Sequence, residues 1–523
     1  MRKPILVLYI ILCCTLSLFA QTDRDRDATE FKDRLKKEYM AMLKERRAEY
    51  EAQRSQMNAE YAEHMRQAWT EYKPSPPKPV PARKEPPKPI VKVSEEQTPE
   101  NAPVVKPVAE PKTPQEDVAK ATVPEEMELP FDNVLEPEES TQPAAPVIPL
   151  PEAEPAAASV PGHTFSYYGV QCKIAGMNST HRFSLNGVKE NEVADAWEEL
   201  SGEKYLPILS QCDNYRKELN LCDWGMVRFL QEMTTSFFSV QESNEAVLMQ
   251  IYMLAQLGYK VRMARTDNRL VLLLPIEDEV FNYPYLQVDG IHYYVIDKYK
   301  GAHSYYVYDK VFPEEMALSL HMLSPPLLQN MNARTVERTL TSKKQVTVSI
   351  KSNLDIIDFY NDYPISSQWR YYSITSLSEA AKQEIYPILQ LQTEGLDKLQ
   401  AANVLLNFVQ TAFEYKTDDE QFGYERPLFG DETLYYPYCD CEDRSILFSI
   451  FIRDLLGLDV VLLNYPNHLA TAVKFEQDVY GDHIILDGEK YVLCDPTYIG
   501  AKVGNAMPNC RNEAAIVQRI SKE

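Results

Sequence analysis

Three residue types that together can carry out nucleophilic catalysis occur in order near the C-terminal end of the sequence. Cys441 stands in "CDCEDRS", His468 in "NHLATAV" and Asp495 in "CDPTY". A cysteine attacks a carbonyl carbon as the thiolate, so it needs a base that takes its proton. The base in turn needs an acceptor that fixes its tautomer. Cys441 is therefore the candidate nucleophile, His468 the candidate base and Asp495 the candidate orienting residue.

The elements predicted around these residues would bring them together. Apolar residues recur at helical spacing after Cys441, and Gly457 ends that pattern as a C-terminal cap. Cys441 is thus expected at a helix N-terminus, where the dipole and the free N–H groups stabilise a thiolate. Residues 460–463 are predicted to form a strand, and His468 opens the next one. The stretch "HIILDGEKYVLCDPTY" predicts a hairpin that turns at residues 487 and 488 and ends its second strand at Asp495.

Each candidate also has a simpler interpretation. Cysteine is among the most buried residue types, so Cys441 could be a core residue. His468 follows Pro466 and Asn467 and could lie in a loop, and Asp495 before a proline is a common turn pair. His483, on a neighbouring strand, is a rival base. The three candidates in this order nevertheless favour a triad.

Residues 400–500 resemble the transglutaminase-like cysteine enzyme superfamily, whose members are relatives of the papain fold. The family pattern is Gly-x-Cys-x-Asp at a helix start, then a histidine that opens a strand, then the aspartate of Asp-Pro-Thr. By position, Cys441 matches the nucleophile, His468 the base and Asp495 its orienting residue, and Asp443 also fits the pattern. The resemblance implies acyl transfer through a thioester.

Cys439 departs from this pattern, because it stands where the family has glycine. Its side chain could crowd the nucleophile or form a reversible disulfide with Cys441, although the two are too close in sequence for an unstrained bond. We expect Cys439 to be non-catalytic. A metal site on Cys439, Cys441 and Cys494 lacks the paired spacing of zinc sites. No cofactor and no metal is therefore predicted.

The globular part of the sequence is similar to itself. "YLPILSQ" parallels "IYPILQL", and "WGMVRFLQEM" parallels "NVLLNFVQTA". Further on, "NEAVLMQIYMLAQLGYKV" parallels "DRSILFSIFIRDLLGLDV", and "VDGIHYYVID" parallels "LDGEKYVLCD". The offset grows once, which indicates an insertion of about twenty residues within "KTDDEQFGYERPLFGDETLYYPYC" of the second copy. These parallels predict an internal duplication.

The first copy lacks the candidate chemistry. Shifted by 199 residues, Cys441 corresponds to Glu242 and His468 to Arg269, whereas Asp495 corresponds approximately to Asp297. We expect a degenerate copy that packs on the active one, narrows its cleft or holds substrate. A purely structural role is the alternative. His292 and the tyrosines near it could form a binding face, although strand tyrosines usually pack half-buried.

The N-terminal third divides into three predicted segments. A basic start at Arg2 and Lys3, a short apolar run and Ala20 predict a signal peptide over residues 1–20. Residues 21–72 have apolar residues at spacings of four and seven and no Gly or Pro, which predicts a long amphipathic helix. That helix is either a lone, partly solvated one or an arm for coiled-coil self-association or docking. Residues 73–160, rich in Pro, Glu and Ala, predict a disordered linker.

These observations together predict an exported protein of α+β class with two tandem transglutaminase-like (papain-like) domains. The degenerate repeat spans residues 161–340 and the catalytic domain residues 341–523. The formal charge of −23 argues against a nucleic-acid partner. Nine cysteines less Cys13 and Cys14 of the signal leave seven, an odd number that does not form a disulfide scaffold by itself.

The predicted function is that of a cysteine peptidase or amidase in the periplasm, at the cell surface or in the medium. Its substrate would be a protein or peptide, cell-wall amides included. The alternative is a non-catalytic module of the same fold that binds another protein, with the N-terminal helix and linker doing the docking.

Overall fold

The computed structural model describes residues 48–82, 88–92, 160–296, 304–310, 315–328, 333–366, 368–510 and 513–520. The predicted signal peptide, residues 21–47 of the predicted helix and residues 93–159 of the predicted linker lie outside this range. Residues 1–63 and 64–523 fall into separate units, and the second unit holds both copies of the repeat. No helix of the described residues has the length and apolar character that a bilayer crossing requires.

The predicted N-terminal helix ends earlier than expected. A helix covers residues 48–65, and strand β1 (Thr70–Tyr72) follows it. β1 pairs antiparallel with β8 (Tyr305–Tyr308), so pairing with a distant strand overrides the local helical pattern. Trp69, predicted in the apolar stripe of the helix, lies beyond its end and donates from Nε1 to the Met65 carbonyl at 3.0 Å.

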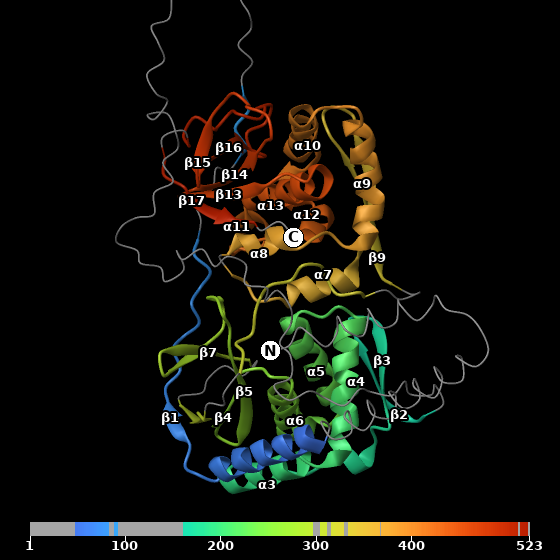
Figure 1. Cartoon of the computed structure of the whole chain (residues 1–523), viewed down its shortest axis with the longest axis vertical. Helices are drawn as coiled ribbons and strands as arrows, with labels where there is room; N and C mark the ends of the chain where they lie inside the picture. Colours follow the sequence, from blue (N-terminus) through green and yellow to red (C-terminus); the bar gives the residue numbers. More distant parts are fainter. Residues whose placement is uncertain are drawn as a thin grey trace, which may run out of the picture. The chain divides into compact units, whose positions relative to one another are not determined.

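The first copy is a sheet with helices beside it (Figure 1). It begins with the hairpin β2 (Gly162–Tyr167) and β3 (Val170–Ala175). Its helices are α3 (Glu190–Leu200), α4 (Leu206–Glu218), α5 (Asp223–Phe237) and α6 (Ser243–Gln256). The strands after α6 are β4 (Arg262–Thr266), β5 (Arg269–Pro275), β6 (Tyr285–Val288), β7 (Ile291–Val295) and β8. The sheet order is β1-β8-β4-β5-β7-β6, and every pair is antiparallel.

The second copy starts with the hairpin β9 (Thr335–Thr341) and β10 (Thr347–Asn353). The predicted domain boundary at residues 340 and 341 therefore falls inside β9. The helices are α7 (Leu354–Asn361), α8 (Trp369–Ile374), α9 (Glu379–Thr393), α10 (Lys398–Ala412), α11 (Asp418–Gln421), α12 (Gly430–Tyr435) and α13 (Cys441–Phe451). Short strands β11 (Glu414–Tyr415) and β12 (Tyr438–Cys439) pair in parallel on either side of the insertion.

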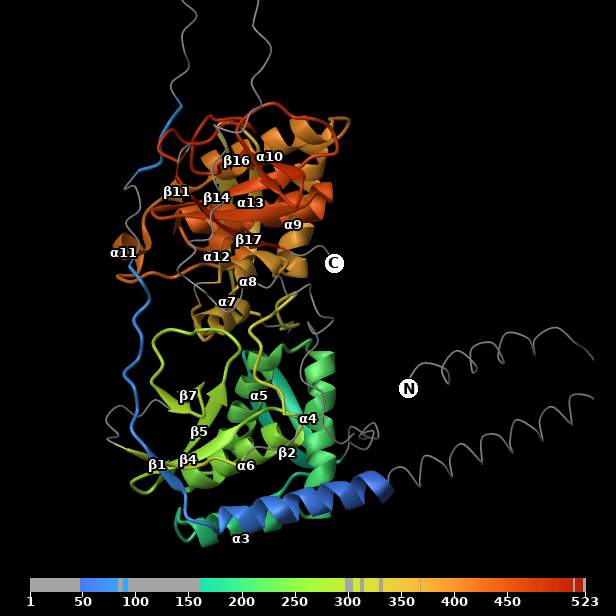
Figure 2. The ribbon, with the colours of Figure 1, turned by 60° about the vertical axis from the view of Figure 1, so that its left-hand side comes forward.

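The main sheet of the second copy packs against α13 and α8 (Figure 2). Its strands are β13 (Val460–Tyr465), β14 (His468–Lys474), β15 (His483–Leu486), β16 (Glu489–Cys494) and β17 (Ile516–Arg519), in the order β15-β16-β14-β13-β17. All pairs in it are antiparallel. The helices and antiparallel sheets of both copies agree with the predicted α+β class at this coarse level.

The two sheets have the same strand order. β8-β4-β5-β7-β6 of the first copy corresponds position by position to β17-β13-β14-β16-β15 of the second. The last hairpin of each copy turns on an Asp-Gly pair with positive φ at both residues: 49° and 81° at Asp289 and Gly290, 53° and 79° at Asp487 and Gly488. The shared order parallels the repeat seen in the sequence, and β1 is an addition at the β8 edge.

The copies differ most between their last two helices. Residues 238–242 join α5 to α6, whereas β11, α11, α12 and β12 lie between α10 and α13. This added segment, residues 416–437, is named the insertion below. It falls within the stretch where the sequence predicted extra residues.

The predicted disordered linker is ordered where the structure describes it. Residues 73–82 and 88–92 run without helix, and two short contacts pair them with the folded part (Figure 2). Ser75 N donates to the Tyr285 carbonyl at 2.8 Å, and Lys92 N donates to the Ile499 carbonyl at 2.8 Å. Backbone groups at loop and sheet edges thus pair with these parts of the proline-rich segment.

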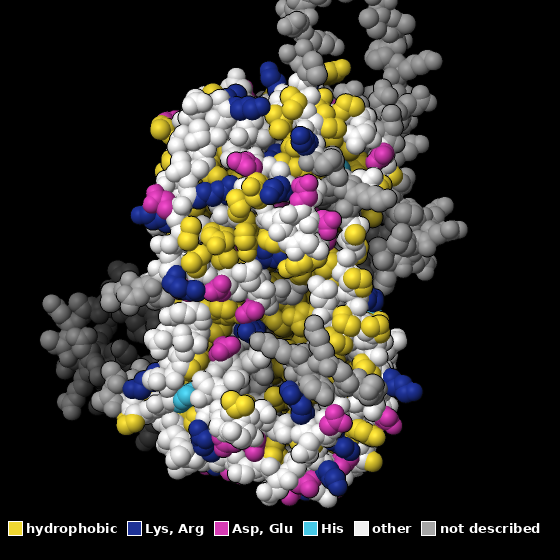
Figure 3. All heavy atoms as spheres, turned by 180° about the vertical axis from the view of Figure 1, so that it is seen from behind, with side chains coloured by type: hydrophobic (Ala, Val, Ile, Leu, Met, Phe, Trp, Pro, Cys, Tyr) yellow, Lys and Arg dark blue, Asp and Glu magenta, His cyan; other side chains and the backbone are white. Residues whose placement is uncertain are grey.

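Charged side chains are interspersed over the surface. On the face in Figure 3, Lys and Arg alternate with Asp and Glu among the described residues, and no broad basic field stands out. Nucleic-acid binding relies on such a field, so this face gives it no support.

Candidate active site

The structure places Cys441 as the first residue of α13, as the sequence predicted. Asp440, the residue before it, has extended backbone, and α13 continues through a π-helical turn (Ile452–Leu456) to Gly457. Gly457 has φ 63°, the left-handed conformation of a C-terminal cap. The thiol thus lies at the positive end of a buried helix, which favours its ionised form.

His468 and Asp495 form a pair on the sheet that packs on α13. His468 is the first residue of β14, and Asp495 directly follows β16, which pairs with β14. His468 Nε2 lies 2.9 Å from Asp495 Oδ2. Because an ionised carboxylate only accepts, this contact assigns the ring proton to Nε2 and leaves a lone pair on Nδ1. Nδ1 is buried and has no hydrogen-bond partner in the described part of the chain.

The thiol lies beside the backbone of the candidate base. The N–H of Leu469, the residue after His468, donates to Cys441 Sγ at 3.4 Å. Ser445, one turn further along α13, donates from Oγ to the Leu469 carbonyl at 2.8 Å. These two hydrogen bonds fix the start of α13 against the start of β14. The thiol therefore lies against the backbone of the residue after His468, and the His468 side chain pairs with Asp495.

A turn with many hydrogen bonds holds the carboxylate of Asp495. Its Oδ1 accepts from the N–H groups of Thr497 and Tyr498 at 2.9 and 3.1 Å. Gln410 of α10 donates from Nε2 to the carbonyls of Asp495, Tyr498 and Ala501 at 3.0, 2.8 and 3.1 Å. Gln410 is a positioning residue that the sequence did not single out, since one buried glutamine in a helix carries no motif.

The site is closed to solvent. Cys441 is 0% exposed and His468 and Asp495 are each 1% exposed. The insertion contributes to this closure, because the carboxylate of Asp418 on α11 approaches that of Glu442, the neighbour of the thiol. A substrate can reach the sulfur only when part of this cover moves.

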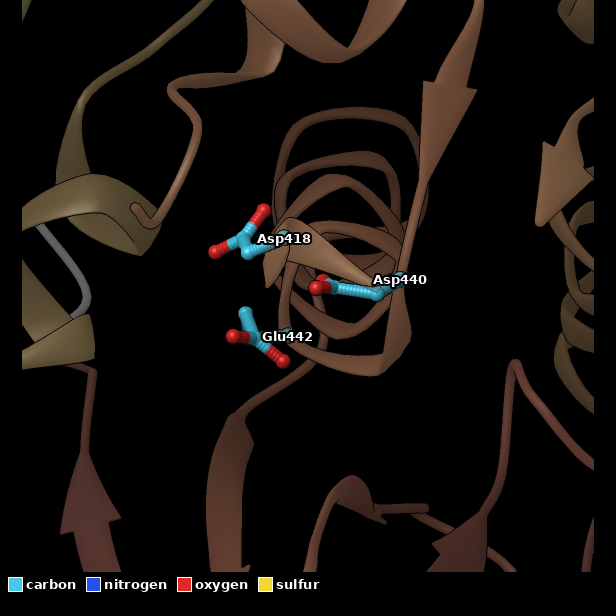
Figure 4. A group of neighbouring side chains, drawn as sticks. All are labelled: Asp418, Asp440 and Glu442. Atoms are coloured by element: carbon cyan, nitrogen blue, oxygen red, sulfur yellow. The ribbon is translucent and has the colours of Figure 1, made fainter. Parts of the chain in front are cut away.

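Asp418, Asp440 and Glu442 form a buried acidic cluster (Figure 4). One carboxylate oxygen of each lies within 4.8 Å of the others. Burial, together with the negative charges of Asp443 and Glu442, raises the pKa of Asp418 to about 10. Burial and Glu442 likewise raise the pKa of Asp443 to about 8. Asp418 thus retains its proton near neutral pH, and we assign no metal to the cluster because acidic side chains alone do not specify an ion.

Glu442 touches the nucleophile directly. The Cys441 thiol lies 3.2 Å from Glu442 Oε2, within donating distance. Glu442 follows Cys441 in "CDCEDRS" and has no place in the triad pattern. Neither its contact with the thiol nor the approach of Asp418 could be found from spacing, since both depend on how the insertion folds back.

The alternatives raised by the sequence lie apart from this arrangement. His483 opens β15, which is separated from β14 by β16, and its Nδ1 contacts the Gly481 carbonyl at 2.9 Å. The Cys439 thiol donates to the Glu414 carbonyl at 3.9 Å, and burial raises its pKa to about 11. The seven cysteines after residue 20 are all buried and free.

The first copy fills the place of the thiol with an amide. Leu270, which corresponds to Leu469, donates its N–H to Asn244 Oδ1 at 2.9 Å, and Asn244 Nδ2 donates to the Asn268 carbonyl at 3.0 Å. Arg269 opens β5 as His468 opens β14. Asp297, the remaining counterpart, lies outside the described residues. One hydrogen bond of the site is therefore matched in the first copy, where Asn244, two residues after the predicted counterpart Glu242, accepts it in place of a thiol.

No family model matches the chain, and neither the curated proteins nor the solved structures include a significant match to it.

Proposed function

We propose that the chain is an exported cysteine enzyme of the transglutaminase-like, papain-like class that acts on amide bonds. The observation that carries the proposal is the convergence of Cys441, His468 and Asp495 from one helix start and two adjacent strands. The shared strand order of the two sheets supports a tandem arrangement in which the second copy is active and the first is degenerate. The predicted signal peptide supports export.

The proposal gives each residue a chemical role. The lone pair of His468 Nδ1 takes the thiol proton, and the Nε2–H remains hydrogen-bonded to Asp495, which stabilises the imidazolium. The thiolate adds to an amide carbonyl, and the Cys441 backbone N–H would donate to the developing oxyanion. His468 then returns the proton to the leaving amine, and water resolves the thioester. Transfer to a second amine would make the same site a crosslinking enzyme.

A binding module without catalysis is the second candidate. The complete burial of Cys441 favours it, because a working nucleophile must meet its substrate. In that case the insertion would be a permanent cover, and the thiol would behave as a core residue.

Alkylation of Cys441 separates the two candidates. The rate of iodoacetamide labelling is measured from pH 5 to pH 9 on the full chain, with peptide mapping of every cysteine. An activated thiol labels at about pH 6, whereas an ordinary one labels only as the pH rises through about 8.5. The six other cysteines after residue 20 are buried and serve as internal controls.

Two histidine variants sharpen this test. His468→Ala should slow labelling of Cys441 at pH 6 by at least about tenfold, because the imidazole no longer takes the proton. His483→Ala is the matched control and should change nothing, since His483 lies two strands away. Equal rates in the wild type and His468→Ala would rule out the thiol–imidazole pair and leave the binding module.

A further inference from the structure

The Cys441 thiol contacts a carboxylate. Cys441 Sγ lies 3.2 Å from Glu442 Oε2, whereas His468 Nδ1 has no hydrogen-bond partner in the part of the chain that the structure describes. Only the thiol proton can link sulfur to an ionised carboxylate. In this closed state the proton therefore lies between Sγ and Glu442 Oε2.

This contact has an electrostatic consequence. If the proton moves from sulfur to His468 while Glu442 is ionised, a thiolate and a carboxylate lie side by side in a buried site. Like charges at this distance disfavour ionisation strongly when water is excluded. If Glu442 carries a proton, its hydroxyl can donate to the thiolate and stabilise it.

Carboxyl groups surround Glu442 on several sides. A carboxylate oxygen of Asp418, on the insertion, lies within 4.8 Å of a carboxylate oxygen of Glu442. Arg426 donates its backbone N–H to Asp418, and its guanidinium pairs with Glu432. The Arg444 side chain donates to the carbonyls of Gln410 and Phe413 rather than to the cluster. The other charged or titratable groups near the pair are Glu425 on the insertion, Asp440 and Asp443 at the start of α13, and His468 and Asp495 on the sheet side.

We propose that Glu442 is a further catalytic residue, which holds the Cys441 proton in the closed state and permits thiolate formation only when its own charge is neutralised or screened by water. The inference rests on the proposed function, since it concerns the same nucleophile. Two events relieve the repulsion: protonation of Glu442 within the acidic cluster, or withdrawal of the insertion, which lets water screen the carboxylate. The insertion thereby couples opening of the site to activation of its sulfur.

Glu442→Gln tests this role, because glutamine keeps the size of the side chain and removes the charge. The pH profile of Cys441 labelling should move down by about one pH unit, which corresponds to about tenfold faster labelling at pH 6. At pH 9, where the thiol is ionised in both proteins, the rates should converge. Asp431→Asn is the matched control: Asp431 is a buried carboxyl on α12 that binds Ser378 and lies outside the cluster. Its profile should equal that of the wild type.

The shape of the profile distinguishes ionisation from simple opening. A rate that rises by the same factor at every pH would mean that the cover opens more readily, and this would overturn the proposal, as would an unchanged profile. Should Glu442→Gln fail to show a cooperative thermal transition, Asp418→Asn takes its place. Asp418→Asn should then move the labelling profile in the same direction by a smaller amount, with about threefold faster labelling at pH 6. An unchanged profile would refute the proposal. Failure of the triad would show in the labelling rate of His468→Ala. The test of Glu442 is distinct, because it compares the profile of Glu442→Gln only with that of the wild type.

Discussion

Gln410 connects the stability of the protein to the geometry of its candidate site, and replacing it gives a quantitative prediction. Its side chain is 1% exposed, and it links α10 to the turn after β16. The amide nitrogen faces three carbonyls, and the amide oxygen accepts from Gly500 N at 3.1 Å. An amide has two N–H donors, so the three carbonyls share two hydrogen bonds, and the fourth contact brings the total to three.

A net value of about 1 kcal/mol for each buried hydrogen bond gives a loss of about 3 kcal/mol in unfolding free energy for Gln410→Ala. Gln410→Glu should cost at least as much at pH 8, because a carboxylate oxygen then faces carbonyl oxygens that it cannot bind. Lowering the pH should restore part of that loss, since a protonated carboxyl regains one donor. Urea unfolding followed by circular dichroism measures both variants. Gln390→Ala, at an exposed position of α9, is the control and should stay within about 0.5 kcal/mol of the wild type.

The same substitution should affect Cys441. Asp495 keeps the two N–H contacts to its carboxylate, yet its own carbonyl loses its anchor on α10. We therefore expect Gln410→Ala to slow labelling at pH 6 in the direction of His468→Ala. A glutamate variant as stable as the wild type at pH 8 would refute the assignment of Nε2 as the donor to three carbonyls. A loss of less than about 1 kcal/mol in the unfolding free energy of Gln410→Ala would refute the hydrogen-bond count.

Three further predictions follow from single contacts. The pKa of Asp418 is raised in the folded protein to about 10, so the folded state binds more protons than the unfolded state above about pH 4 and stability falls as the pH rises toward 10. Asp418→Asn should flatten that slope by up to about 1.4 kcal/mol per pH unit in unfolding experiments at pH 5, 7 and 9, and an unchanged slope would contradict the raised pKa. Ser445→Ala removes the buried hydroxyl that joins α13 to β14, and should lower the unfolding free energy by about 1 kcal/mol in urea titrations, with no effect counting against that contact. Gly481→Ala should lower the thermal denaturation midpoint more than Gly430→Ala does. The reverse order would contradict the prediction. The first has φ 139° and meets neighbouring backbone, whereas the second meets only side-chain tips.

Local signals in the sequence were sufficient to place the parts of the site. The helix start at Cys441, the strand opened by His468 and the Asp-Gly turn at residues 487 and 488 each depend on a few adjacent residues. Their convergence could be expected only through a resemblance, because the contact of Leu469 N with the thiol joins residues 28 apart in the chain. The predicted order of elements was right for this reason, while the contacts between them had to come from the structure.

Features that depend on distant pairing were missed. Residues 70–72 have a helical pattern, yet they form β1 because β8 offers an open edge. The glycine-free composition of residues 21–72 predicted a helix, and the proline-rich composition of residues 73–160 predicted a disordered segment. Neither composition shows which strand edge the chain pairs with. Asp418 is a further case: nothing in "KTDDEQ" shows that its carboxylate turns toward Glu442.

The comparison of the two copies limits what the insertion can be for. Both copies have a backbone N–H, that of Leu270 or Leu469, directed at the side chain at the start of the preceding helix. In the first copy an asparagine accepts it, and residues 238–242 suffice to connect the helices. In the second copy a thiol accepts it, and residues 416–437 are added together with a buried acidic cluster that the first copy does not have among its described residues. If the insertion served only packing, the amide-bearing copy would need it equally. Its presence beside the thiol alone is the reason to look for its role in controlling when Cys441 ionises.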